Sequence, residues 1–136
     1  MGKRRFRILD TNVLINFWIQ FRLWQRNEAE VRMFAQRLMR IYNTDLIASP
    51  VRIEFLCGIT SSHRPQLWTA FIQAFKTIDE RNIPRADWEE AERIAKRVSR
   101  HGRPRKLGDC LLKAIALRLN CDIVTADSDF EQRVRP

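Results

Sequence analysis

Four acidic residues lie where this sequence changes from one predicted element to the next: Asp10, Glu54, Asp109 and Asp127. Asp10 and Asp127 each follow a short apolar stretch, and Asp109 stands at the start of an apolar helical pattern. Carboxylates that converge on one place repel each other strongly unless cations offset their charge. A set of oxygen ligands selects hard cations. If the fold brings these four side chains together, we therefore expect a site for Mg²⁺ or Mn²⁺.

Each of these acids also has a purely structural explanation. The run DTN at residues 10–12 offers side-chain oxygens that can cap the first turn of a helix. Asp109 suits the positive end of a helix, Asp127 suits a turn, and Glu54 suits a solvated helix surface. These explanations suffice one by one, but they lose force if all four acids meet at one edge of the fold.

The acids are connected by short apolar strands that alternate with amphipathic helices. The predicted strands cover residues 5–9, 46–48, 76–79 and 122–125. The predicted helices cover residues 13–24, 28–42, 51–59, 64–75, 84–102 and 107–120. This alternation favours one α/β domain, residues 1–136, with a parallel central sheet and helices on both faces. Ligands bind beyond the carboxyl ends of such strands, where Asp10 and Asp127 are expected.

The chain is strongly basic. Its 136 residues include 25 Lys and Arg against 16 Asp and Glu, which gives a net charge of +9. Basic residues occur throughout, with local concentrations at residues 3–5 and 103–106. A charge of this size favours binding to polyanions such as nucleic acid or a strongly acidic protein, although a solvated basic face also explains the local runs.

The cysteines and histidines indicate no further site. Cys57, Cys110 and Cys121 each lie in an apolar context without a CxxC pair, which predicts three buried thiols in a reducing compartment. His63 and His101 stand apart, so neither a zinc cluster nor a Cys/His dyad is indicated. No signal-peptide pattern or apolar run of membrane-spanning length is found, and we expect a soluble, cytoplasmic protein.

The order and spacing of the four acids resemble the PIN domain, and most closely the VapC-type toxin ribonucleases of VapBC toxin–antitoxin pairs. The resemblance rests on DTN after the first strand, on Glu54 in the helix after SP at residues 49–50, and on GDCLLKAIALRLNCDIVTADSDF at residues 108–130. It covers nearly the whole chain, but residues 61–103 match only in helical character.

This resemblance implies a metal-dependent endoribonuclease with a four-carboxylate site. Asp10 and Asp109 would be the principal ligands of one or two Mg²⁺ or Mn²⁺ ions, Asp127 would complete the site, and Glu54 would hold a second ion or position water. Asp129 is the alternative to Asp127, because TADSDF contains two acids. The resemblance also implies a homodimer and a cognate VapB-type antitoxin that covers the acidic pocket.

Several neighbouring residues are candidates for the surroundings of the site. Arg103, Arg105 and Lys106 immediately precede the helix of the third acid and are predicted to form a basic rim for RNA. The hydroxyls of Thr11 and Thr125 are expected to hydrogen-bond to the carboxylates, with helix capping an equally good explanation for Thr11.

Aromatic residues give a candidate partner surface. Phe17, Trp18, Trp24 and Trp68 exceed what one small core needs, although aromatic residues at helical spacing are most often core. Two other functions would fit parts of this pattern. A haloacid-dehalogenase-type phosphotransferase needs a second Asp where this chain has Asn12. A non-catalytic, basic PIN-like module that binds RNA or a partner remains the alternative, but none of the expected acids is missing.

Overall fold

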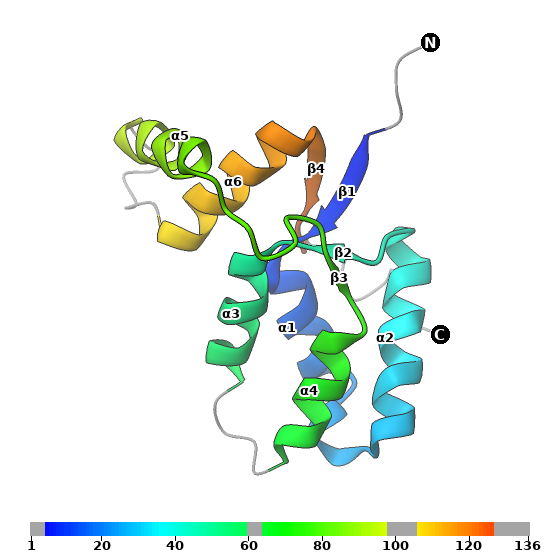
Figure 1. Cartoon of the computed structure of the whole chain (residues 1–136). Helices are drawn as coiled ribbons and strands as arrows, with labels where there is room; N and C mark the ends of the chain where they lie inside the picture. The colour runs from blue at the N-terminus through cyan, green and yellow to red at the C-terminus, as the bar shows by residue number, and fades with distance from the viewer. Residues whose placement is uncertain (1–4, 60–63, 98–105, 127–136) are drawn as a thin grey trace.

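Short strands and longer helices alternate in the structure as the sequence predicts (Figure 1). The computed structural model describes residues 5–59, 64–97 and 106–126. The strands are β1 (Phe6–Leu9), β2 (Leu46–Ile47), β3 (Lys76–Thr77) and β4 (Cys121–Val124). The helices are α1 (Thr11–Gln20), the short 3₁₀ helix η1 (Leu23–Gln25), α2 (Glu28–Tyr42), α3 (Ser49–Gly58), α4 (Pro65–Gln73), α5 (Arg85–Lys96) and α6 (Leu107–Leu119).

The strands form one parallel sheet in the order β3-β2-β1-β4. β1 and β4 pair along their whole length, from Phe6 beside Cys121 to Leu9 beside Val124. The chain crosses the sheet from β1 to β3 and then returns through α5 and α6 to place β4 on the other side of β1. A topological switch point therefore lies between β1 and β4, and ligands bind beyond the carboxyl ends of the strands at such points. The predicted α/β class with a parallel central sheet flanked by helices is confirmed.

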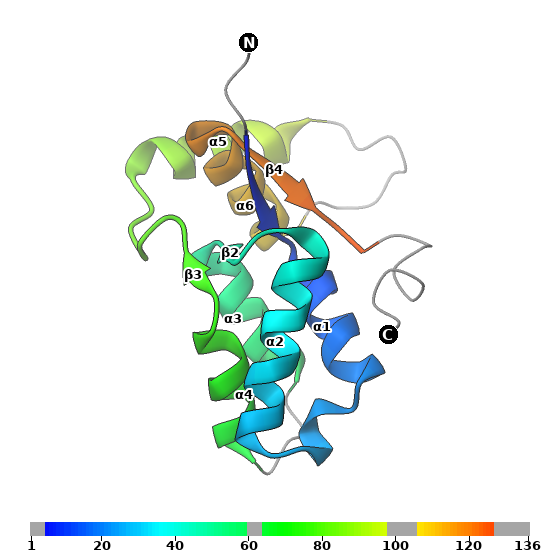
Figure 2. The same cartoon turned by 90° about the vertical axis from the view of Figure 1, so that its right-hand side faces the viewer.

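The helices pack in two groups (Figures 1 and 2). α1 to α4 form one group below the strands, whereas α5 and α6 lie together beside β4. α6 belongs to both cores, because Leu112 and Ile115 join the main cluster while Leu111 and Ala114 pack in a second cluster with Ile94 of α5. Burial on two sides explains why the sequence of α6 is apolar on more than one face.

The aromatic residues of α1 belong to the core. Phe17 is fully buried and stacks on Phe71, and Trp18 is 3% exposed and also contacts Phe71. Trp68 is partly buried, whereas Trp24 is 37% exposed. The interpretation of aromatic residues at helical spacing as core is therefore confirmed for Phe17 and Trp18, which contact Phe71 of α4 and are not available to a partner.

The helix predicted over residues 13–24 is divided in the structure. It begins at Thr11, because Asp10 caps it, and ends at Gln20. Arg22 then adopts a left-handed conformation with φ 49°, and Leu23–Gln25 form a separate 3₁₀ turn. A left-handed residue cannot continue an α-helix, so the apolar spacing persists across a break in the backbone.

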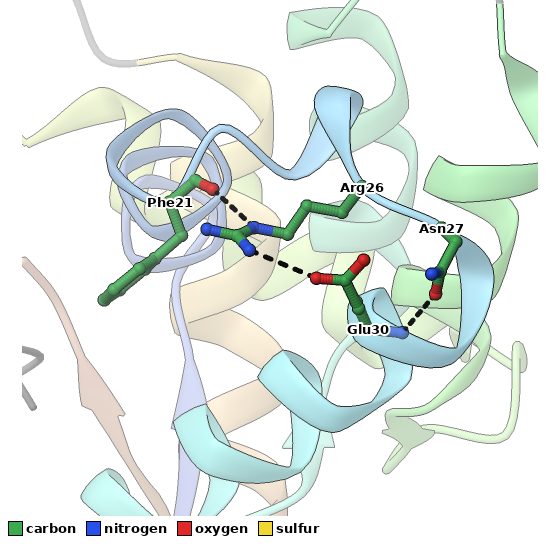
Figure 3. A network of polar contacts seen from close by, with 4 residues as sticks. All are labelled: Phe21, Arg26, Asn27 and Glu30. Carbon is green, nitrogen blue, oxygen red and sulfur yellow. Dashed lines mark hydrogen bonds and ion pairs between the residues drawn. The ribbon is translucent and has the colours of Figure 1, made fainter.

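Side-chain contacts fix this break (Figure 3). Arg26 donates from Nε to the carbonyl oxygen of Phe21 at 3.0 Å and pairs through Nη1 with Glu30 at 3.2 Å. Asn27 caps α2 by accepting a hydrogen bond from the Glu30 amide at 2.8 Å. One arginine thus ties the end of α1 to the start of α2.

Two other predictions need correction. α5 ends at Lys96, because Arg97 is extended, and residues 98–102 of the predicted helix lie outside the described residues. Cys110 and Cys121 are buried, but Cys57 is exposed on the solvent side of α3. His63 and His101 also lie outside the described residues.

In the part of the chain that the structure describes, no helix has the length and apolar character needed to span a bilayer.

Candidate active site

Asp10 lies directly beyond β1 at the switch point. Its amide donates to the Val124 carbonyl at 2.9 Å, which continues the pairing of β1 with β4 by one residue. Its Oδ1 accepts from the Thr11 amide at 2.7 Å, so the same carboxylate caps α1. The capping explanation and the site prediction are therefore both compatible with the position of Asp10.

Asn12 holds the end of β4 against the start of α1. Its Oδ1 accepts a hydrogen bond from the Ala126 amide at 3.1 Å. Ala126 immediately precedes Asp127, and both Asp127 and its alternative Asp129 lie outside the described residues. The sequence pattern assigned Asn12 a capping role, but its side chain instead connects two segments that are distant in sequence.

Glu54 reaches from α3 to the first turn of α6. A Cβ atom built on Gly108 would lie 1.8 Å from Oε1 of Glu54 and 2.6 Å from its Cδ. Only glycine at position 108 permits this approach, which brings the half-buried carboxylate to the positive end of α6. Gly108 was not singled out from the sequence. The available signal was a glycine directly before Asp109.

The charges of the three described acids act on one another. Burial raises the pKa of Asp10 above its ordinary value, the Thr11 amide opposes this rise, and the charge of Asp109 adds to it. Burial also raises the pKa of Glu54, and the charges of Asp109 and Asp10 raise it further. Asp109 itself is exposed in the first turn of α6. The charges of Asp10, Glu54 and Asp109 thus act on one another, whereas their role as one site stays a prediction.

Two lysines offset this negative charge. Lys113 lowers the pKa of Asp10, and Lys106 lowers that of Glu54. Lys106 belongs to the predicted basic rim, whereas Arg103 and Arg105 lie outside the described residues. Lys113 was not predicted, although it follows Asp109 by four residues and therefore lies on the same face of α6.

Thr11 places a further oxygen beside Glu54. It is 8% exposed, and its hydroxyl opposes the rise in the Glu54 pKa. Within the described residues, however, Thr11 Oγ1 makes no hydrogen bond of regular geometry, so we treat this contact as electrostatic. Thr125, the other predicted hydroxyl, is exposed after β4.

The donor types at this place fit a hard divalent cation. Asp10, Glu54, Asp109 and Thr11 offer only oxygen atoms, which Mg²⁺ and Mn²⁺ prefer. Yet no group of three or more His, Cys, Asp or Glu residues among those described is placed so that it could hold a metal ion. The described acids are close enough to affect one another's pKa but do not make a complete ligand set.

Two buried acids were not predicted as important. Asp79 follows β3, is 5% exposed, and accepts through Oδ1 from the Ser49 amide at 3.0 Å. It therefore caps α3, the helix that carries Glu54. Asp87 is 2% exposed and accepts from Nε of Arg118 at 2.9 and 3.0 Å, which ties α5 to α6. Both acids support the elements that carry the site.

Fold and site together define an α/β domain with clustered carboxylates at the switch point of a parallel sheet. The family model of the PIN domain matches residues 7–135, and the chain belongs to this family. PIN domains are typically nucleases that use divalent metal ions, and PIN nucleases bind RNA. Comparison with curated proteins and with solved structures gives no match.

Proposed function

We propose that this protein is a metal-dependent endoribonuclease that hydrolyses phosphodiester bonds. The observation that carries this proposal is the convergence of Asp10, Glu54 and Asp109 beyond β1 and at the start of α6, where burial and mutual repulsion raise the pKa of two of them. Such an arrangement is unfavourable without a cation to offset it. The basic charge of the chain favours a polyanionic substrate.

The proposed roles follow the resemblance to PIN nucleases. Asp10 and Asp109 would be the principal ligands of a divalent ion, Mg²⁺ or Mn²⁺, and Asp127 would complete the site. Glu54 would hold a second ion or orient the attacking water. A bound divalent cation supplies charge neutralisation at the phosphate and activation of water.

The surrounding residues of this chain set the geometry and charge. Asn12 fixes the segment before Asp127, and Gly108 admits the Glu54 carboxylate. Lys106 and Lys113 reduce the repulsion between the acids and the phosphate, because they place positive charge at the margin of the cluster.

Carboxylate variants test the reaction. Asp10→Asn and Asp109→Asn should each abolish Mg²⁺- or Mn²⁺-dependent cleavage of RNA while circular dichroism stays that of the wild type. Asp45→Asn is a matched control, because Asp45 is an exposed carboxylate that pairs with Lys76 away from the site. Cleavage by both site variants would refute the assignment. RNA binding without cleavage by the wild type would favour the non-catalytic module, and sequencing the 5′ ends left in total RNA would identify the target.

We infer further that the protein is the toxin of a type II toxin–antitoxin pair, a homodimer and cytoplasmic, as its resemblance to VapC-type toxins implies. Exposed apolar side chains beside the site give an antitoxin a surface to cover: Ile53 and Leu56 on α3 and Leu107 on α6 are 64%, 37% and 70% exposed. Expression should arrest growth, and the product of a small adjacent reading frame should relieve the arrest. Arrest by Asp10→Asn, or no relief by any adjacent product, would contradict the toxin role, and sedimentation velocity tests the dimer.

A further inference from the structure

A groove apart from the cluster of Asp10, Glu54 and Asp109 is lined by residues of α5, α6 and β4. Its volume is about 510 Å³, and its apolar part comes mainly from Ile94, Ala116 and Leu117. Leu117 is 69% exposed and presents an apolar side chain to the groove. The groove is therefore open to a ligand along the second half of α6.

Positive side chains from three elements line this groove. Arg5 precedes β1, Arg97 follows α5, and Lys113 lies on α6. Arg5 pairs with Asp122 at 3.1 Å, and Arg97 lies 4.0 Å from Glu90. The side chains of Arg5 and Arg97 are 49% and 67% exposed, so solvent weakens these pairs and a phosphate can approach both guanidinium groups. The three basic side chains outnumber the two acidic ones that line the groove, Glu90 and Asp122, so the groove has a net positive charge.

Lys113 connects the groove to the carboxylate cluster. It lies one helical turn after Asp109, and its charge acts on Asp10. The same side chain lines the groove together with Ala116 and Leu117 on the following turn. A polyanion that leaves the cluster along α6 would therefore meet Lys113 first and the apolar part of the groove next.

We propose that this groove holds the single-stranded RNA next to the cleaved bond, with Lys113 contacting the first phosphate outside the carboxylate cluster and Arg5 and Arg97 contacting later ones. This inference rests on the proposed nuclease function. The apolar surface around Leu117 accepts the face of a base, while the cations follow the backbone, as in proteins that bind single strands without base readout. Double-stranded RNA has no unstacked base that could lie against Leu117.

Binding and cleavage are measured on the same set of variants. Fluorescence anisotropy with a fluorescein-labelled, 12-nucleotide RNA of mixed sequence in EDTA reports binding without turnover. Lys113→Gln should weaken binding about five-fold at 0.1 M salt and reduce the salt slope by about 0.7, because one phosphate contact on a single strand contributes that slope. Lys76→Gln is the matched control, because β3 lies at the opposite edge of the sheet from β4. It should change neither quantity.

A second variant tests the apolar part of the groove. Leu117→Asp changes an exposed side chain, so the fold should persist, and it should weaken RNA binding at least as much as Lys113→Gln. Wild-type binding by both variants would overturn the proposed groove, and if those variants still cleave RNA, the nuclease assignment stands without it. If the wild type does not cleave RNA but both groove variants lose binding, the RNA groove stands and the nuclease assignment fails. Displacement of the RNA by an equal concentration of polyglutamate would overturn the assignment to RNA.

Discussion

Replacement of Gly108 by alanine tests whether the position of Glu54 matters for the reaction. The new Cβ would lie 1.8 Å from Glu54 Oε1, whereas real Cβ contacts essentially never fall below 3.0 Å. The carboxylate must therefore move by about 1.2 Å, the difference between these two distances. A misplacement of about 1 Å in a catalytic group can reduce the rate about 100-fold, and we expect a loss of kcat of that order.

Stability should change in the opposite direction from activity. Alanine is favoured over glycine inside a helix by about 0.5–1 kcal/mol. The Glu54 side chain is half-buried and flexible, so it can move away without disturbing the core. Gly108→Ala should therefore melt at or slightly above the wild-type temperature, while cleavage of a fluorescent single-stranded RNA in Mg²⁺ or Mn²⁺ falls sharply.

A double-mutant cycle separates displacement of the Glu54 carboxylate from a general effect of Gly108→Ala on α6. If Gly108→Ala acts through Glu54, it should have little further effect on the rate in a Glu54→Ala background. Gly58→Ala serves as a steric control, because its Cβ would lie 2.7 Å from Ile15 Cδ1 rather than from a carboxylate. Full activity of Gly108→Ala, or an equal loss in the presence and absence of Glu54, would refute the reasoning.

Three other substitutions have expected effects on stability. Burial raises the pKa of Asp10 in the folded state, so its ionisation lowers the stability of the fold as pH rises through that pKa. Asp10→Asn should therefore melt above the wild type at pH 7. A gain that persists unchanged below about pH 3, where Asp is protonated in both the folded and the unfolded state, would contradict this cause. Arg118→Met leaves the buried Asp87 carboxylate without its partner and should lower the free energy of unfolding in urea by about 3 kcal/mol. This loss should exceed that of Asp87→Asn, and a smaller loss would show that the ion pair is not what stabilises α5 on α6. Asp79→Ala removes the acceptor for the Ser49 amide and should lower the free energy of unfolding in urea by about 1–2 kcal/mol. An unchanged urea unfolding transition would exclude a capping role of Asp79 on α3.

The sequence predicts the elements well because each strand and helix has its own apolar pattern. The strand predicted over residues 5–9 is observed as Phe6–Leu9, and the helix predicted over 28–42 is observed as Glu28–Tyr42. Of the weak strand predicted over 76–79, only Lys76–Thr77 is a strand. The order of strands in the sheet cannot be predicted in the same way, because strand pairing depends on contacts between segments that are distant in sequence. The position of β4 beside β1, which makes the switch point, follows only from the structure.

Helical spacing failed where a partner outside the helix decides which face is buried. The pattern of α5 predicts that Trp88 faces inward, but Trp88 is 47% exposed and Asp87 is buried. The cause is Arg118, which lies 31 residues further along the chain and binds both oxygens of Asp87. No pattern within α5 contains that information.

The candidate site was predictable in its acids but not in what positions them. Acidic residues after strands and at helix starts predict where carboxylates gather, and the charges of Asp10, Glu54 and Asp109 do act on one another. Gly108 leaves room for the Glu54 carboxylate of α3, and the charge of Lys113 lowers the pKa of Asp10 after β1. Both effects join segments that are distant in sequence, so only the packing of α6 against α3 and β1 identifies these two residues.

The structure also explains how mutually repelling carboxylates can stay together in a small domain. Among the described residues, the contacts that hold their elements come from the backbone and from neighbouring side chains. The Asp10 backbone continues the pairing of β1 with β4, Asn12 holds the end of β4, and the Asp79 carboxylate caps the helix of Glu54. Hydrogen bonds around the acids therefore hold their elements in place, which is what the proposed cation site requires.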